Sequence, residues 1–290
     1  MSAIAQELES QPGCWEEASR LAPGVGAALP SPGERVLAVG CGTSLHVAQS
    51  FAALRESSSQ GETDAFPASE APVDRAYDRV VVISRSGTTT EVVRLLDRVR
   101  GPSVALTAVG GSPVAGRASA AIVLDFADER SVVQTRFATT ALALLRRHLG
   151  QDLAAAIEDA RGALASGPPE DLASYEHFVF LGRGWTVGLA NEAALKVREA
   201  SGSYSESYTA LEYRHGPISL AGASSLVWAF SGVEPDLLDD VRATGARVVA
   251  GDRDPMAELV LVQRMAVALA ERKGLDPDHP RHLTRSVVLS

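Results

Sequence analysis

The chain has 290 residues, of which 46% are hydrophobic and 22% are charged, as in ordinary globular proteins. Its net charge of −9 is spread along the sequence, which argues against nucleic-acid binding through a basic face. No apolar run reaches the ~18 to 20 residues that span a bilayer, and the N-terminal stretch is acidic where a signal peptide would be basic, so we expect a cytoplasmic protein. Cys14 and Cys41 lie in unrelated contexts, which predicts two free thiols.

Apolar runs of strand type alternate with helical segments in the first half of the chain. Runs rich in Val, Ile and Leu lie at 35–40, 79–84, 103–108 and 121–125, and helices are expected at 44–57, 89–100 and 132–149. Because these runs are almost wholly apolar, they are typical of parallel strands that helices cover on both faces. The pattern predicts a first α/β domain over 23–150, after an N-terminal helical segment at 1–22.

The second half repeats this order. An Ala-rich helical pattern that ends in "SGPPED" predicts a linker over 151–172. Strands are expected at 178–182, 225–231 and 247–250, and helices at 186–200, 235–244 and 255–273. This predicts a second domain over 173–275, with one strand fewer, and a tail over 276–290. The stretches "RVLAVGCGTSLHVAQSFAAL" and "HFVFLGRGWTVGLANEAAL" share a strand, a Gly-x-Gly turn and a helix, which indicates two copies of one unit.

Two hydroxyl-rich turns follow strands of the first domain, "GCGTS" at 40–44 and "SRSGTTT" at 84–90. Ligands of a parallel sheet lie beyond the carboxyl ends of its strands. Gly42 and Gly87 let the backbone approach a ligand, and the hydroxyls that can donate to an anion are those of Thr43, Ser44, Ser84, Ser86 and Thr89. Either turn alone is also explained by helix capping, but the pair favours a phosphate site. No Gly-x-x-x-x-Gly-Lys-Ser/Thr sequence occurs, so a nucleotide P-loop is excluded.

Other ligand types receive less support. "GRGWTVG", at 182–188, fits the spacing of some dinucleotide turns, but no acidic residue is clearly placed ~20 positions further on, so nicotinamide binding is the lesser alternative. His279 and His282 are three apart without a third ligand of metal-site type, so no metal is predicted. We expect no cofactor.

The stretch "ALKVREASGSYSESYTALEYRHGP" carries the candidate catalytic groups. Lys196 and Glu199 are three apart on a predicted helix and share a face. A solvated pair is the alternative, but the helix is rich in Ala and Leu, and Lys196 and Lys273 are the only lysines. A carboxylate beside a bound sugar phosphate can move a proton between C1 and C2. His215 lies in a Gly-Pro turn and is either an ordinary loop histidine or an acid/base group.

In combination the motifs resemble those of the double sugar isomerase (SIS) domain family. "GCGTS", "SRSGTTTE", "FLGRG", "EAALKVRE", "HGPISL" and "DPDHPRHLTRSVVLS" occur in its order and at its spacing, from about Gln6 onward. The chain is most similar to the isomerase half of glucosamine-6-phosphate synthase and to free-standing bacterial phosphosugar isomerases and deaminases. The resemblance implies two flavodoxin-like SIS domains, each a mostly parallel sheet flanked by helices, in a homodimer with its site at the subunit boundary.

The resemblance also assigns roles to residues. It implies phosphate binding by Ser84, Arg85, Ser86, Gly87 and Thr89, sugar binding by Cys41, Gly42, Thr43, Ser44, Val132 and Gln134, proton transfer by Glu199 beside Lys196, and ring opening by His215 from the partner subunit. The tail would close the site.

Several positions depart from the family pattern. Arg85 replaces an amide, Gln134 replaces a serine, and Arg285 stands where the synthase has a substrate-binding lysine. Arginine stays protonated and forms no imine, but it can still clamp an anion. The resemblance does not include the glutaminase half, so we expect no glutamine-dependent amination by this chain alone.

The sequence thus predicts a phosphosugar isomerase that acts on an aldose/ketose or amino-sugar 6-phosphate through an enediol(ate). Glu199 would be the base, Lys196 and Arg285 would offset negative charge, and His215 would assist ring opening. A sugar-6-phosphate deaminase or deglycase is the first alternative, and a phosphosugar-binding sensor without catalysis is the second. We expect neither a nucleic-acid nor a membrane partner. The residues do not identify the sugar.

Overall fold

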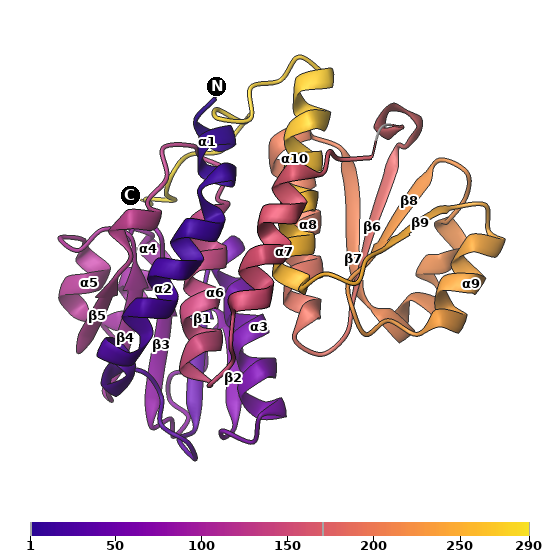
Figure 1. The fold of residues 1–290 in the computed structure, drawn as a ribbon. Coiled ribbons are helices and arrows are strands. Elements are labelled where there is room, and N and C mark those ends of the chain that lie inside the picture. The colour runs from indigo at the N-terminus through magenta and orange to yellow at the C-terminus, as the bar shows by residue number, and fades with distance from the viewer. Residues whose placement is uncertain (1, 170, 290) are drawn as a thin grey trace. The chain divides into compact units, whose positions relative to one another are not determined.

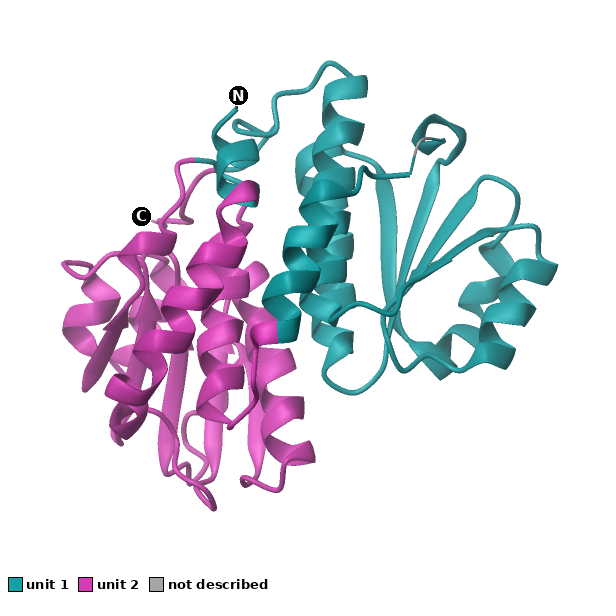
Figure 2. Ribbon diagram, in the orientation of Figure 1, with its two compact units in different colours: residues 1–8, 131–133, 155–283 teal, residues 9–130, 134–154, 284–290 magenta. Residues whose placement is uncertain are grey.

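The computed structural model describes residues 2–169 and 171–289, so Ser290 of the expected tail and Met1 of the N-terminal segment lie outside the described residues. Two compact units divide the chain (Figure 2). Unit 1 comprises Met1–Leu8, Ser131–Val133 and Ala155–Leu283, and unit 2 comprises Glu9–Arg130, Gln134–Ala154 and Thr284–Ser290. Each unit is described by itself below.

Unit 2 contains a parallel sheet of five strands in the order β2-β1-β3-β4-β5 (Figure 1). The strands are β1 (Val36–Gly40), β2 (Thr63–Pro67), β3 (Arg79–Ile83), β4 (Ser103–Thr107) and β5 (Ala120–Val123). Strands β1 and β3 are adjacent, with Val36 opposite Arg79 and Val39 opposite Val82. Because Val36–Gly40 is buried along its whole length, it needs apolar side chains on both faces, as the sequence predicts.

Helices pack around this sheet. They are α2 (Gln11–Val25), α3 (Thr43–Ser57), α4 (Thr90–Leu96), α5 (Pro113–Arg117) and α6 (Arg136–His148). Helix α6 packs against α2 and α3. The indole of Trp15 is fully buried in α2 and donates a hydrogen bond of 3.0 Å to Thr139 Oγ1 of α6, so it finds a polar partner inside the core.

Unit 1 contains a parallel sheet of four strands in the order β7-β6-β8-β9. They are β6 (His177–Gly182), β7 (Tyr204–Thr209), β8 (Ser225–Ala229) and β9 (Arg247–Ala250). The helices that accompany them are α8 (Thr186–Ser201), α9 (Pro235–Ala243) and α10 (Pro255–Arg272), and α8 packs against α10. Two further helices belong almost entirely to unit 1. Helix α1 (Ala3–Glu9) lies in its N-terminal segment, and helix α7 (Ala154–Ala165) begins the segment Ala155–Leu283.

The α/β class with two mostly parallel sheets is confirmed, and each expected strand is found within a few residues. Strands β2 and β7 were not predicted, because neither "TDAFP" nor "YSESYT" is a continuous apolar run. Both strands lie at sheet edges, where less apolar surface is buried. The helix expected from 132 begins at Arg136, and the one expected to reach residue 100 ends at Leu96. The second sheet has one strand fewer than the first, as the sequence indicates.

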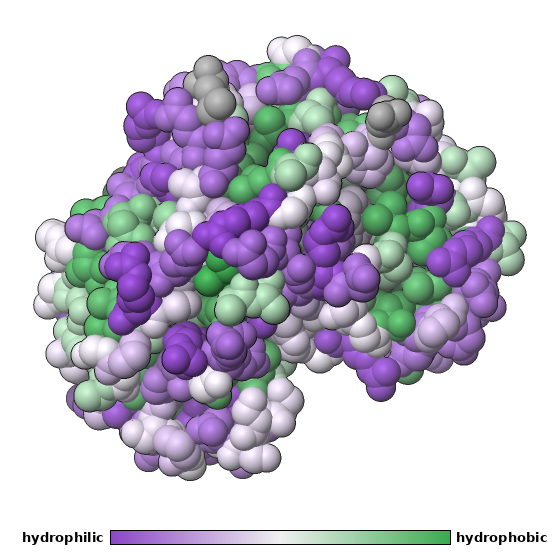
Figure 3. Space-filling model, viewed as in Figure 1, coloured by the Kyte–Doolittle hydropathy of each residue, from purple (hydrophilic) through white to green (hydrophobic). Residues whose placement is uncertain are grey.

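Two surface properties accompany this fold. On the face shown in Figure 3, hydrophilic and hydrophobic residues are intermixed. Within residues 2–169 and 171–289, no helix is both long enough and apolar enough to span a membrane.

Candidate functional site

The hydroxyl turn, which we define as Ser84–Thr89, follows the carboxyl end of β3 in unit 2. Its first hydroxyl residues, Ser84 and Ser86, are buried. Gly87 has a φ of +63°, and a Cβ placed there would lie 2.0 Å from Ser112 Oγ. Since both the conformation and the space exclude a side chain, the glycine fixes the path of the turn.

Four hydroxyl groups meet at this turn. Ser286 Oγ, from the tail, lies 3.1 Å from Ser86 Oγ, 2.9 Å from Thr88 Oγ1 and 3.5 Å from Thr89 Oγ1. Thr88 Oγ1 also donates to Ser86 Oγ at 3.1 Å. Because each hydroxyl rotates and both donates and accepts, the cluster can turn its donors toward an anion. Sequence reasoning missed Thr88 and Ser286; the density of hydroxyls in "SGTTT" was a signal for Thr88, whereas nothing local marks Ser286.

A second turn, at 40–44, follows β1, the strand next to β3 in this parallel sheet. A Cβ on Gly40 would lie 2.4 Å from the Ser44 carbonyl carbon, so the strand passes against the first turn of α3. Thr43 and Ser44 are buried there. Cys41 is half-buried, and burial raises the pKa of its thiol, which favours the neutral form. The two turns thus lie at the same edge of the sheet, as predicted.

Arg85 is buried, and its guanidinium is engaged within unit 2. Its Nη1 lies 3.6 Å from Glu129 Oε2, with both side chains almost fully buried, and its Nη2 donates to the Arg285 carbonyl at 2.9 Å. Glu129 Oε1 in turn accepts a 2.8 Å bond from the Arg136 backbone N–H at the start of α6. This carboxylate therefore caps α6, which explains why the helix begins at Arg136.

The tail runs over the hydroxyl turn. Arg285 pairs with Asp128 and donates to the Glu129 carbonyl, so its guanidinium is held by the segment after β5. Thr90 N donates to the Val287 carbonyl at 3.1 Å, and Leu289 N donates to Thr90 Oγ1 at 2.8 Å. These contacts hold Ser286 against the turn.

Val132 and Gln134 lie in the segment before α6. Val132 belongs to unit 1, where its backbone N–H donates to the Asp278 carbonyl at 3.2 Å. Gln134 belongs to unit 2 and is half-buried. Its Oε1 is buried and has no hydrogen-bond partner among the described residues, so this amide oxygen can accept a bond from a ligand.

In unit 1, helix α8 carries a buried triad of Glu192, Lys196 and Glu199. Lys196 forms an ion pair with Glu199 Oε2, and its Nζ lies 3.4 Å from Glu192 Oε1. The side chains of Lys196 and Glu192 are 1% and 2% exposed, whereas that of Glu199 is 21% exposed. The spacing of four and three residues places all three on one face. The predicted pair therefore exists, and sequence reasoning missed Glu192, whose signal was its position four residues before Lys196.

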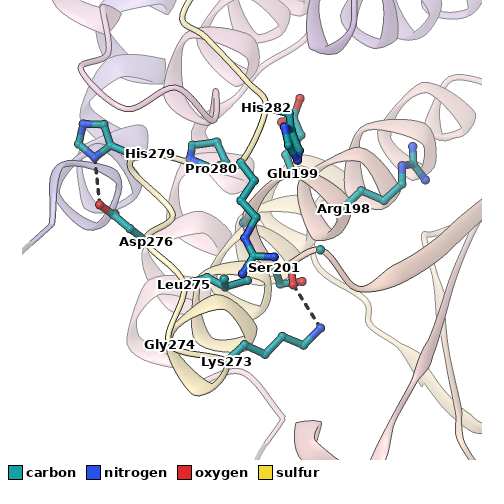
Figure 4. A pocket seen from close by; sticks show the side chains of 13 residues that line it. Arg198, Glu199, Ser201, Lys273, Gly274, Leu275, Asp276, His279, Pro280 and His282 are labelled. Carbon is teal, nitrogen blue, oxygen red and sulfur yellow. Dashed lines mark hydrogen bonds and ion pairs between the residues drawn. The ribbon is translucent and has the colours of Figure 1, made fainter.

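Glu199 lines a cavity of about 730 Å³ within unit 1, formed by the end of α8 and the segment after α10 (Figure 4). The charged or titratable residues of its wall are Arg198, Glu199, Lys273, Asp276, His279, Arg281 and His282. Most of them have partners within unit 1; Glu199 pairs with Lys196, and Arg198 donates to the Ser205 carbonyl at 2.8 Å. Lys273 Nζ donates to Ser201 O at 3.2 Å and to Ser203 Oγ at 2.7 Å, and His279 Nδ1 lies 3.0 Å from Asp276 Oδ2 (Figure 4).

His215 does not line this cavity. It lies between two 3-10 segments, Ala210–Arg214 and Pro217–Leu220, and is exposed. Leu211 and Leu220 of these segments are 44% and 61% exposed. Among residues 2–169 and 171–289, no group of three or more His, Cys, Asp or Glu is arranged to hold a metal ion.

Comparison with known proteins adds to this geometry. Residues 31–146 match the SIS domain family. This part of the chain, which lies almost entirely in unit 2, is thus similar to an SIS domain. It is 28% identical to the glutamine--fructose-6-phosphate aminotransferase [isomerizing] of Sulfurisphaera tokodaii over 88% of this chain and 50% of that relative. The chain thus spans about half the length of the curated relatives it matches.

Solved structures share the two-sheet fold of this chain. A glucosamine-6-phosphate deaminase from Thermotoga maritima superposes with a TM-score of 0.82 at 26% identity, covering 99% of this chain and 100% of the other. A tagatose-6-phosphate ketose/aldose isomerase from Escherichia coli gives a TM-score of 0.80 at 20% identity, covering 100% and 96%. The second likeness concerns the fold alone. The two flavodoxin-like sheets expected from the sequence are therefore confirmed.

Proposed function

We propose that the chain is a phosphosugar isomerase that acts on an aldose/ketose or amino-sugar 6-phosphate through an enediol(ate). The observation that carries this proposal is the triad on α8, in which a buried ammonium holds Glu199 while part of that carboxylate opens to a cavity. A general base that removes a proton from carbon has to be held in a fixed orientation and has to be accessible to the substrate. This arrangement meets both requirements.

In the proposed reaction, Glu199 accepts the proton on the carbon next to the carbonyl and returns it to the neighbouring carbon. Lys196 keeps the carboxylate in place through its ion pair, and its ammonium offsets the negative charge of the enediolate. Glu192, at 3.4 Å, balances the charge of the buried ammonium. The triad thus separates positioning groups from the one group that meets the substrate.

The hydroxyl turn of unit 2 supports a phosphorylated substrate. A phosphate ester carries a charge of about −1.5 to −2 and offers three acceptor oxygens. Ser86, Thr88 and Thr89 supply hydroxyl donors, and hydrogen bonds to a charged acceptor are stronger than those between neutral groups. Since the guanidinium of Arg85 is engaged with Glu129 and the tail, we assign binding to the hydroxyls and the backbone, and assign to Arg85 the support of the turn.

A deaminase is the second candidate function. It is favoured by the similarity to a glucosamine-6-phosphate deaminase along 99% of this chain. The same base would form an enaminol from the amino sugar, and protonation of this enaminol at C1 would give an imine at C2. Water would then hydrolyse the imine to the ketose, with release of ammonia. The products separate the two functions, because ammonia is released only by the deaminase.

The test begins with a thermal-shift screen of hexose, hexosamine and ketose 6-phosphates, followed by product analysis of each hit. We expect conversion by the wild-type protein, and binding without conversion by Glu199→Gln, which keeps size and removes the base. Conversion by Glu199→Gln at the wild-type rate would reject the mechanism. Binding by the wild type with no product over long incubation would favour a sensor.

We further propose a homodimer in which His215 acts on a substrate bound by the partner subunit. The exposure of His215 beside the exposed Leu211 and Leu220 supports a protein interface at this surface. Mixing two inactive variants, Glu199→Gln and His215→Asn, tests it. Random exchange of subunits should restore about a quarter of the wild-type sites if each site takes one residue from each subunit. No recovery in a mixture shown to exchange would contradict the proposal.

A further inference from the structure

His282 has a backbone conformation that is uncommon for residues other than glycine. Of the described residues other than glycine, Ser59 and His282 have a positive φ, and that of His282 is 62°. This left-handed region is unfavourable for residues with a Cβ, and glycine and asparagine adopt it more readily. Residues in sparsely populated backbone conformations often lie at functional sites, so His282 is a candidate for a functional role.

The side chain of His282 lines the cavity that Glu199 also lines. In the view of Figure 4, the two labelled side chains are drawn at the same end of this cavity, whereas Asp276 and His279 are drawn together on another side. The two residues come from different segments, the last turn of α8 and the chain after α10. A carboxylate and an imidazole therefore line the same open cavity, in which His282 is exposed.

The enediol reaction requires two kinds of proton transfer. One group exchanges the proton on carbon, and a second exchanges protons with the two oxygens, because a full negative charge on oxygen would otherwise develop. Glu199 serves the carbon in the proposed function. Lys196 is enclosed between two carboxylates with 1% of its side chain exposed, so it can offset charge through its positive field but is not placed to exchange protons with the oxygens.

Two of the groups that line the cavity are imidazoles, His279 and His282, and an imidazole can both donate and accept a proton. The others are Arg198 and Glu199 from α8, and Lys273, Asp276 and Arg281 from the segment after α10. His279 is held by Asp276 at 3.0 Å, and its side chain is 82% exposed. No hydrogen bond to the His282 ring is found among the described residues, so its two nitrogens remain available to a ligand.

We infer that His282 is the second proton-transfer residue, serving the substrate oxygens while Glu199 serves carbon; this inference rests on the proposed function. Glu199 takes the proton from carbon, the released electron pair forms the C=C bond, and the carbonyl oxygen takes a proton from the His282 imidazolium. The neighbouring hydroxyl then returns a proton to the imidazole as its C=O bond forms, and protonated Glu199 delivers its proton to the other carbon. Protons and electrons balance over the cycle, and the enzyme ends as it began.

The test compares His282→Asn with His279→Asn. Asparagine tolerates the positive φ, so the first substitution removes the imidazole with little effect on the backbone. We expect His282→Asn to lower kcat at least 10²-fold with KM nearly unchanged, and to alter the pH profile of kcat, because a group that exchanges protons with the substrate is lost. We expect His279→Asn to stay within about three-fold of the wild type, since its imidazole faces Asp276.

A second variant guards against loss of folding. His282→Gly accepts the same φ and leaves a space for free imidazole, which should restore part of the rate. A wild-type kcat and pH profile in His282→Asn, or no rescue of His282→Gly, would overturn the inference. If Glu199→Gln is inactive while His282→Asn is fully active, the role of His282 is rejected and the proposed function stands. If the wild type converts no sugar phosphate, both the role of His282 and the proposed function are rejected.

Discussion

Replacing Lys196 with methionine removes the ammonium of the buried triad while keeping the length of the side chain. The Nζ of Lys196 lies 3.4 Å from Glu192 Oε1, and the two side chains are only 1% and 2% exposed. Removing one partner of a buried ion pair costs about 3 to 5 kcal/mol, because the remaining charge stays buried. We therefore expect Lys196→Met to destabilise the protein by about that amount, measured by urea unfolding followed by circular dichroism.

The other lysine provides the matched control. Lys273 is exposed and donates to Ser201 O and Ser203 Oγ, so Lys273→Met should cost no more than about 1 kcal/mol. Adding Glu192→Gln to Lys196→Met removes the buried charge and should recover a large part of the lost stability. Equal stability of Lys196→Met and Lys273→Met, or no recovery in the double variant, would refute the argument that the triad is a coupled buried charge cluster.

Two further predictions concern unit 2. Ser86→Ala should weaken binding of a sugar 6-phosphate about 10- to 100-fold in calorimetric titration, because one hydrogen-bond donor to a charged group is lost. The exposed Ser57 provides the control, and an equal loss of affinity in Ser57→Ala would contradict the prediction. The hydrogen bonds from Arg79 lower the pKa of Glu34 despite partial burial, so this carboxylate contributes stability above its unfolded pKa that is lost as the pH falls through its folded pKa. The Tm gap between wild type and Glu34→Gln should therefore be largest near pH 7 and narrow between about pH 5 and pH 3, and a gap that does not change with pH would contradict this.

The sheet strands were predictable wherever both faces are buried. Val36–Gly40 and Arg79–Ile83 are apolar because helices cover them, so the sequence carries their signal directly. The edge strand Tyr204–Thr209 bears tyrosines that donate to Glu206, as Tyr208 OH does to Oε2 at 2.9 Å, and its serines donate to α8. A strand stabilised in this way lacks the apolar run by which strands are recognised.

Residues of the candidate site were predictable when their partners are near in sequence. Lys196 and Glu199 share a helix face, and the helical period alone brings them together. The contacts of Arg285 with Asp128 and of Ser286 with Ser86 join segments more than 150 residues apart, so no local pattern encodes them.

The most direct test of the central claim, that Glu199 exchanges a carbon-bound proton of a phosphosugar, is hydrogen exchange in ²H₂O followed by proton NMR. The wild type, incubated with the sugar 6-phosphate that it binds best, should introduce deuterium at C1 or C2, while Glu199→Gln binds the same compound and introduces none. Exchange by Glu199→Gln at the wild-type rate would contradict the account.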